Sequence, residues 1–67
     1  MNWRECIEQR PEVMLGKPVI KGTRLTVELM LERLANGAPM EDLLESYPQL
    51  RPEHIQAALA FAADHLS

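Results

Sequence analysis

The stretch GKPVIKGTR, residues 16–24, decides how the fold of this chain is predicted. It combines two glycines, a proline, three basic side chains and a Val-Ile pair, a mixture that suits neither a helix nor an ordinary loop. Val19 and Ile20 favour a pleated, half-buried strand, and Gly16 and Gly22 supply backbone freedom on either side of them. The stretch therefore predicts a short strand between two special turns.

An extended segment places successive side chains on opposite faces. Lys17, Val19 and Lys21 are then expected on one face, and Pro18 and Ile20 on the other. The strand is therefore expected to present a basic face with an apolar back.

Helical periodicity follows the strand. Thr26 can cap a first helix, and the Asn36-Gly37 pair predicts its end, because glycine is the usual residue of a left-handed C-terminal cap. A second helix is expected to start at Pro39 and to stop at Pro48. A third helix is expected to start at Pro52, and Leu50 is expected to fill the gap between the second and third helices.

Each helix is expected to bury one apolar stripe. The stripes are Val27, Met30, Leu31 and Leu34 on the first helix; Met40, Leu43, Leu44 and Tyr47 on the second; and Ile55, Leu59, Ala62 and Leu66 on the third.

The length of 67 residues allows one domain with a small core. Residues 1–25 are expected to form a β-containing arm and residues 26–67 a three-helix bundle, so the fold class is mainly α with a short N-terminal strand or hairpin. Large apolar side chains outnumber what one small core can hold, and the single Cys6 cannot form an internal disulfide, so a homodimer is expected. The residues assigned to a dimer or partner interface are Trp3, Ile7, Leu29 and Phe61, the last two as exposed apolar side chains left over from the stripes.

The net charge of −3 is unevenly distributed, with +2 on residues 1–24 and −5 on residues 25–67. The second and third helices are separated by about four residues, the spacing of a helix-turn-helix in which the third helix would read DNA bases. Glu53 opposes that role, and positive charge for phosphate contact comes mainly from the N-terminal segment. The candidate nucleic-acid contacts are Lys17, Lys21 and Arg24 in that segment, and Arg51, His54 and Gln56 at the start of the third helix.

Several motifs in order resemble the small prokaryotic family called domain of unknown function 433: GKPVIKGTR, the Ala-Asn-Gly turn at 35–37, Tyr-Pro-Gln-Leu at 47–50 and Ile-Gln-Ala-Ala-Leu at 55–59. The resemblance covers roughly residues 7–63. It implies a homeodomain-like three-helix fold behind a small β element. It also implies the antitoxin half of a toxin–antitoxin pair, encoded beside a toxin that resembles PIN-type ribonucleases.

The chain departs from the family pattern before two of its helices. Ala38 and Arg51 stand where the family prefers Ser, Thr or Asp, and neither can cap in the usual way. Arg51 also places a cation at the unfavourable end of a helix dipole. A residue that is unfavourable locally points to function, so Arg51 is expected to contact a phosphate or a partner.

Enzymatic, metal-binding and membrane functions find no support in the sequence. No nucleophile–base signature or phosphate loop occurs, and His54 and His65 lie about 16 Å apart along one helix, too far to share a metal. No cofactor is expected. Without a signal peptide, a membrane-spanning apolar run or a cysteine framework, the protein is expected in the cytoplasm.

Two hypotheses of function remain. In the first, the protein is an antitoxin-like dimer that binds operator DNA through the helix-turn-helix and the basic N-terminal segment. In the second, it is a protein-interaction module with a degenerate helix-turn-helix and no DNA binding, whose acidic helices complement a basic, RNA-binding face of the partner. The charge distribution separates the two only weakly.

Overall fold

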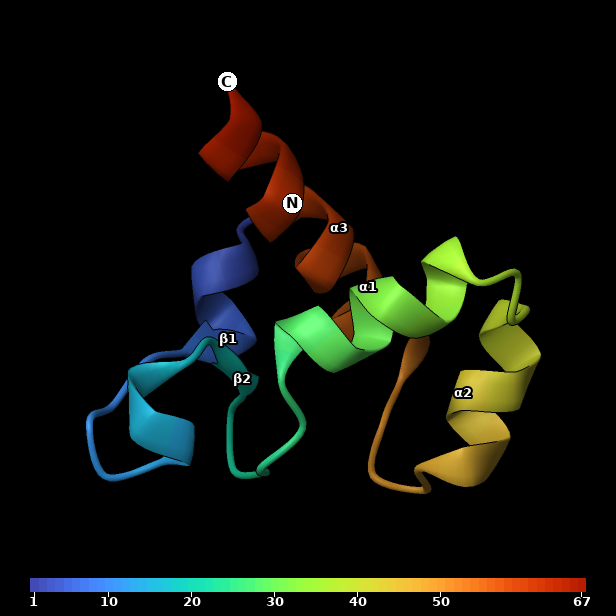
Figure 1. The fold of residues 1–67 in the computed structure, drawn as a ribbon, viewed down its shortest axis with the longest axis horizontal. Helices are drawn as coiled ribbons and strands as arrows, with labels where there is room; N and C mark the ends of the chain where they lie inside the picture. The colour runs from blue at the N-terminus through green and yellow to red at the C-terminus, as the bar shows by residue number, and fades with distance from the viewer.

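A computed structural model describes all of residues 1–67 (Figure 1). Three helices follow a small antiparallel sheet, which confirms the predicted fold class. The elements in chain order are the 3₁₀ turn η1 (Trp3–Glu5), β1 (Ile7–Glu8), the 3₁₀ turn η2 (Met14–Gly16), β2 (Val19–Ile20), α1 (Val27–Ala35), α2 (Met40–Ser46) and α3 (Pro52–Leu66). None of the helices combines the length and the apolar character needed to cross a membrane.

Strand β2 pairs with β1 in a two-stranded sheet and also touches the segment before α1. Ile20 pairs with Ile7 of β1, and Val19 pairs both with Glu8 and, through an isolated bridge, with Thr26. Val19 and Ile20 are both fully buried, so the expected division into a basic and an apolar face is wrong. The strand is only two residues long, and Lys17 and Lys21 lie in the turns outside it.

Helix α1 begins and ends as the sequence predicts. The Thr26 hydroxyl accepts a hydrogen bond from the Leu29 N–H at 3.0 Å, and Gly37 has the left-handed φ of +90° expected of a C-terminal cap. Val27 and Met30 are buried against the other helices. Thr26 thus links the sheet to the first turn of the bundle.

Helix α2 starts one residue later than predicted, because Pro39 has an extended ψ of 157° and occupies the N-cap position. Leu43 is the buried residue of this helix. Leu50 is buried between α2 and α3, and α3 begins at Pro52, both as predicted. The helix-turn-helix spacing is therefore present in the fold.

The buried stripe of α3 differs from the predicted one. Ile55, Ala57, Ala58 and Phe61 are buried, whereas Leu59 is 48% exposed and Leu66 is 88% exposed. The helix is contacted by α1, α2 and also η1, which covers the face that contains Phe61. The last turn projects beyond the rest of the molecule (Figure 1), which leaves Leu66 in solvent.

Trp3 anchors the N-terminal arm on α3. Its ring meets Phe61 edge to face, with centroids 4.8 Å apart, and its Nε1–H donates to Asp64 Oδ2 at 2.6 Å. The Arg4 guanidinium lies 4.4 Å from the centre of the same ring. Ile7 and Ile20 of the arm belong to the same buried cluster as the helix residues, so arm and bundle share one core.

Replacing Trp3 by alanine tests this anchor. We expect Trp3→Ala to lower the free energy of unfolding by about 2–3 kcal/mol, less than for a fully buried aromatic because Trp3 is half-buried. Arg4→Ala is the matched control and should cost below about 1 kcal/mol, the value of an exposed cation–π contact. Urea unfolding followed by circular dichroism measures both, and equal losses would contradict the anchoring role.

Candidate partner-binding surfaces

The three basic residues of the N-terminal segment have different surroundings. Lys17 Nζ lies 3.0 Å from Glu28 Oε1 of α1, so its charge is paired. Lys21 and Arg24 are exposed in the turn between β2 and α1 and form no ion pair. Only Lys21 and Arg24 are therefore free to meet a phosphate.

The turn that contains Lys21 and Arg24 is well held. The Thr23 hydroxyl donates to the Ile20 carbonyl at 2.8 Å and accepts from the Leu25 N–H at 3.0 Å. The Lys21 N–H donates to the Cys6 carbonyl at 2.9 Å. The two free cations thus extend from a fixed backbone.

The start of α3 uses one of its predicted base contacts for capping. Arg51 occupies the N-cap position, and its guanidinium offers no acceptor for the helix N–H groups. His54 Nδ1 instead accepts a hydrogen bond from the Arg51 N–H at 3.0 Å, which is the reciprocal half of a capping box. His54 therefore stabilises the helix end, while Arg51 and Gln56 remain exposed.

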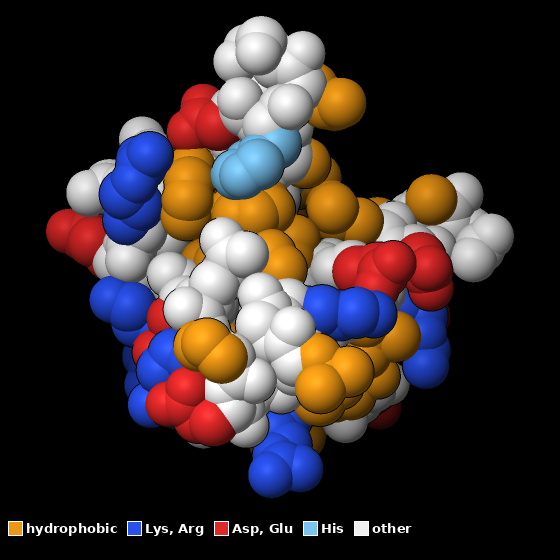
Figure 2. All heavy atoms as spheres, turned by 60° about the vertical axis from the view of Figure 1, so that its left-hand side comes forward, with side chains coloured by type: hydrophobic (Ala, Val, Ile, Leu, Met, Phe, Trp, Pro, Cys, Tyr) orange, Lys and Arg blue, Asp and Glu red, His pale blue; other side chains and the backbone are white.

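The structure does not unite the candidate nucleic-acid contacts in one basic surface. In Figure 1 the turn after β2 lies at the lower edge of the molecule, whereas α3 starts behind α1. On the face shown in Figure 2, basic side chains are scattered and acidic ones lie between them. A continuous basic face is absent from this side of the molecule.

Helix α2 presents carboxylates without cation partners. Glu41, Asp42 and Glu45 are all exposed, and none forms an ion pair. Glu41 and Glu45 are four residues apart, a like-charge arrangement that costs a helix about 0.2–0.5 kcal/mol. Glu45 also lies in the last turn of α2, where the helix dipole disfavours an anion. We call these three residues the acidic face.

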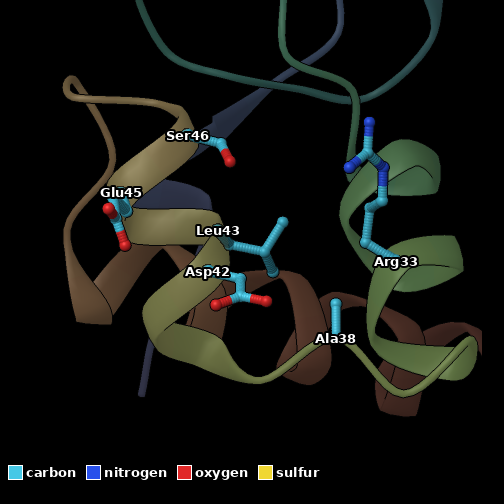
Figure 3. A pocket seen from close by; sticks show the side chains of 6 residues that line it. All are labelled: Arg33, Ala38, Asp42, Leu43, Glu45 and Ser46. Carbon is cyan, nitrogen blue, oxygen red and sulfur yellow. The ribbon is translucent and has the colours of Figure 1, made fainter.

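A polar cleft of about 300 Å³ separates the acidic face from α1. Figure 3 shows Asp42, Leu43 and Ser46 pointing from α2 toward α1, with Arg33 on the opposite wall. Arg33 forms no ion pair across the cleft. The cleft is therefore open to a side chain from a partner. Its lining residues are Arg33, Ala38, Asp42, Leu43, Glu45 and Ser46.

An apolar groove of about 400 Å³ lies between α1 and α3. Phe61, assigned from the sequence to a partner interface as an exposed residue, is only 9% exposed and contributes to the groove lining. The groove is bordered by two exposed carboxylates on α1, and its lining residues are Pro18, Val27, Glu28, Leu31, Glu32, Ala35 and Phe61. It is the most apolar concave surface of the chain.

The other predicted interface residues are less available. Ile7 is 4% exposed and belongs to the core, so it offers little surface to a partner. Trp3 and Leu29 are half-buried. Of the four residues assigned from the sequence, Phe61 is the one that faces a concave surface.

Both histidines contact their own helix. The His65 ring stacks on Phe61 with centroids 4.0 Å apart, and its Nδ1–H donates to the Phe61 carbonyl at 2.9 Å. No group of three or more His, Cys, Asp or Glu side chains is placed to hold a metal ion.

A small β hairpin ahead of a three-helix, helix-turn-helix bundle defines the class of domain. Residues 7–62 match the model of the family described as protein of unknown function DUF433, and the chain belongs to that family. It is 36% identical over 59 residues to Uncharacterized protein y4eO of Sinorhizobium fredii (strain NBRC 101917 / NGR234). The match covers 88% of this chain but only 27% of that relative, so the chain spans about a quarter of its length. No solved structure matches the chain.

The capping role of His54 can be measured directly. We expect His54→Ala to lower the free energy of unfolding by about 1 kcal/mol, because the Arg51 N–H loses its acceptor. His54→Gln should restore most of the loss, since glutamine also serves at this position of a capping box. Gln56→Ala is the control, because Gln56 is exposed on the same helix and its side chain forms no hydrogen bond. Equal stability of the alanine and glutamine variants in urea would refute the capping role.

Proposed function

We propose that the protein is a cytoplasmic, antitoxin-like component of a toxin–antitoxin pair, and that its acidic face binds a ribonuclease-like toxin. A ribonuclease carries positive charge where it meets RNA phosphates. A protein that blocks such a surface gains from carboxylates placed opposite those charges. The acidic face supplies three carboxylates, of which Asp42 and Glu45 also line the adjoining cleft opposite Arg33.

The position of Glu45 is the observation that carries this proposal. An anion in the last turn of a helix, four residues after another anion, destabilises α2 by roughly 0.5–1 kcal/mol in total. No cation of the same chain compensates for it within ion-pair distance. A cation on a partner protein would compensate for the charge of Glu45. A residue that is unfavourable in its own chain is an indication of function.

DNA binding is the second candidate, supported by Lys21 and Arg24. Both are exposed and unpaired on a turn that the Thr23 hydroxyl holds by two hydrogen bonds, which suits contact with phosphates. The start of α3 supports base reading less well, because His54 is used for capping and Glu53 repels the DNA backbone. Operator binding by the dimer would therefore depend on the turn after β2.

Reversing the charge of Glu45 separates its effect on the stability of α2 from its effect on partner binding. We expect Glu45→Lys to raise the free energy of unfolding by about 0.5–1 kcal/mol, because the lysine suits the helix end and pairs with Glu41. The same change should weaken binding to the product of the neighbouring gene by about tenfold or more. Urea unfolding and calorimetric titration measure the two effects.

Glu5→Lys is the matched control, since it makes the same change in net charge on η1. It should leave the affinity for the toxin within about twofold. The proposal is wrong if the two proteins neither co-purify nor restore growth on co-expression. Equal weakening by both variants would move the contact away from the acidic face.

The salt dependence of operator binding tests the second candidate. We expect Lys21→Ala and Arg24→Ala each to reduce the slope of log K against log salt by about 0.9, because each removes one phosphate contact. Lys17→Ala should reduce it less, since Lys17 already pairs with Glu28. Binding to the promoter that does not depend on salt, or no binding, would exclude this function.

A further inference from the structure

The loop around η2 holds a leucine in an unfavourable backbone conformation at the surface. Met14 and Leu15 have φ of 49° and 58°, and Gly16 follows with φ of 83°. The left-handed region is sterically unfavourable for a leucine. Leu15 is nevertheless 94% exposed, so its side chain gains nothing from the core of its own chain.

Hydrogen bonds fix this loop in place. The Gly16 N–H donates to the Val13 carbonyl and the Lys17 N–H to the Met14 carbonyl, each at 3.1 Å. Gln9 Nε2 donates to the Gly16 carbonyl at 3.3 Å. Leu15 is therefore presented on a preorganised support, and strain that persists at an exposed site indicates function.

We propose that Leu15 inserts into the α1–α3 groove of a second copy of this chain, and that the second copy inserts its own Leu15 in return. The inference gives residues to the homodimer that the sequence predicts. It goes beyond the proposed function and depends on neither toxin binding nor DNA binding. It also moves the expected seam away from Ile7, which is buried, to η2 and the outer face of α1.

The positions of the loop and the groove suit a two-fold axis. Pro18, which lines the groove, follows Leu15 by three residues, and Lys17 bonds to Glu28 at the groove border. Projection and recess thus lie close together on one surface of one chain. A two-fold dimer needs such a self-complementary patch, because each subunit gives and receives the same contact.

Charge also favours a second copy as the occupant. Arg10 and Lys17 already pair with Glu8 and Glu28 of the same chain, which leaves Lys21 after β2 and Glu32 at the groove border without an ion pair. In a two-fold dimer Lys21 of each subunit can meet Glu32 of the other. Figure 2 shows hydrophobic side chains exposed among charged ones on the N-terminal side, as at an interface of mixed character.

The available surface is large enough for this contact. A standard interface covers about 800 Å² on each partner. That is roughly a sixth of the 4501 Å² accessible surface of the chain.

Leu15→Asn gives the sharpest test, because it is expected to weaken assembly without lowering the stability of the single chain. Asparagine tolerates the left-handed conformation better than leucine, so the midpoint of urea unfolding of the single chain should not fall. The dissociation constant of the dimer should rise at least a hundredfold, since two buried leucine contacts are lost. Leu66→Asn, at another strongly exposed leucine, is the control and should leave the dimer unchanged.

A second variant blocks the recess. Ala35→Arg places a long side chain over the groove at an exposed position near the end of α1, where a cation suits the helix dipole. It should weaken the homodimer as much as Leu15→Asn does. Mixing the two variants should restore a heterodimer, because one intact leucine and one intact groove remain in that pair.

Sedimentation velocity over a concentration series of the purified protein alone measures these outcomes, so neither a toxin nor DNA affects the result. A wild-type chain that stays monomeric at all concentrations would overturn the inference. So would a dimer that neither variant weakens, or two variants that do not associate when mixed. Failure of toxin or operator binding, by contrast, would leave the measured dimer intact.

Discussion

Burial of Val19 and Ile20 is the constraint on which the rest of the structure depends. The two residues pair with β1 on one side and reach Thr26, the cap of α1, on the other. The Ile20 N–H also donates to the Leu25 carbonyl, and the Val27 N–H to the Pro18 carbonyl. One short strand therefore fixes both the hairpin and the position of the first helix. It also sets where the exposed turns on either side of the strand begin and end.

The sequence predicts the helices well because local residues mark their ends. Gly37 and Pro52 set boundaries through backbone chemistry that needs no distant partner. The strand faces were mispredicted because alternation has no meaning over two residues. The stripe of α3 was mispredicted because Trp3, far away in the chain, covers Phe61 and thereby decides which side of the helix is buried.

Among the surface residues, too, some roles can be predicted from the local sequence and others depend on distant contacts. The capping by His54 follows from its place three residues after the N-cap, so the sequence carried a usable signal for it. The pairing of Lys17 with Glu28 depends on how the hairpin meets α1, which no local pattern records. The left-handed Leu15 is the hardest case, because leucine is not a residue that predicts positive φ.

The departures from local rules are concentrated outside the core. Buried side chains are apolar apart from Thr26, and no buried side-chain polar atom lacks a partner. Leu15 and Glu45, by contrast, are exposed residues in settings that cost stability and that nothing in the single chain repays. Met14 at positive φ and Arg51 at the N-cap of α3 are further exposed departures, but Leu15 and Glu45 are the two points where the proposals place a second molecule. The same reasoning separates the two points, since an apolar projection needs a recess and an unpaired carboxylate needs a cation. The two proposals therefore assign them different partners, a second copy at Leu15 and a basic protein at Glu45.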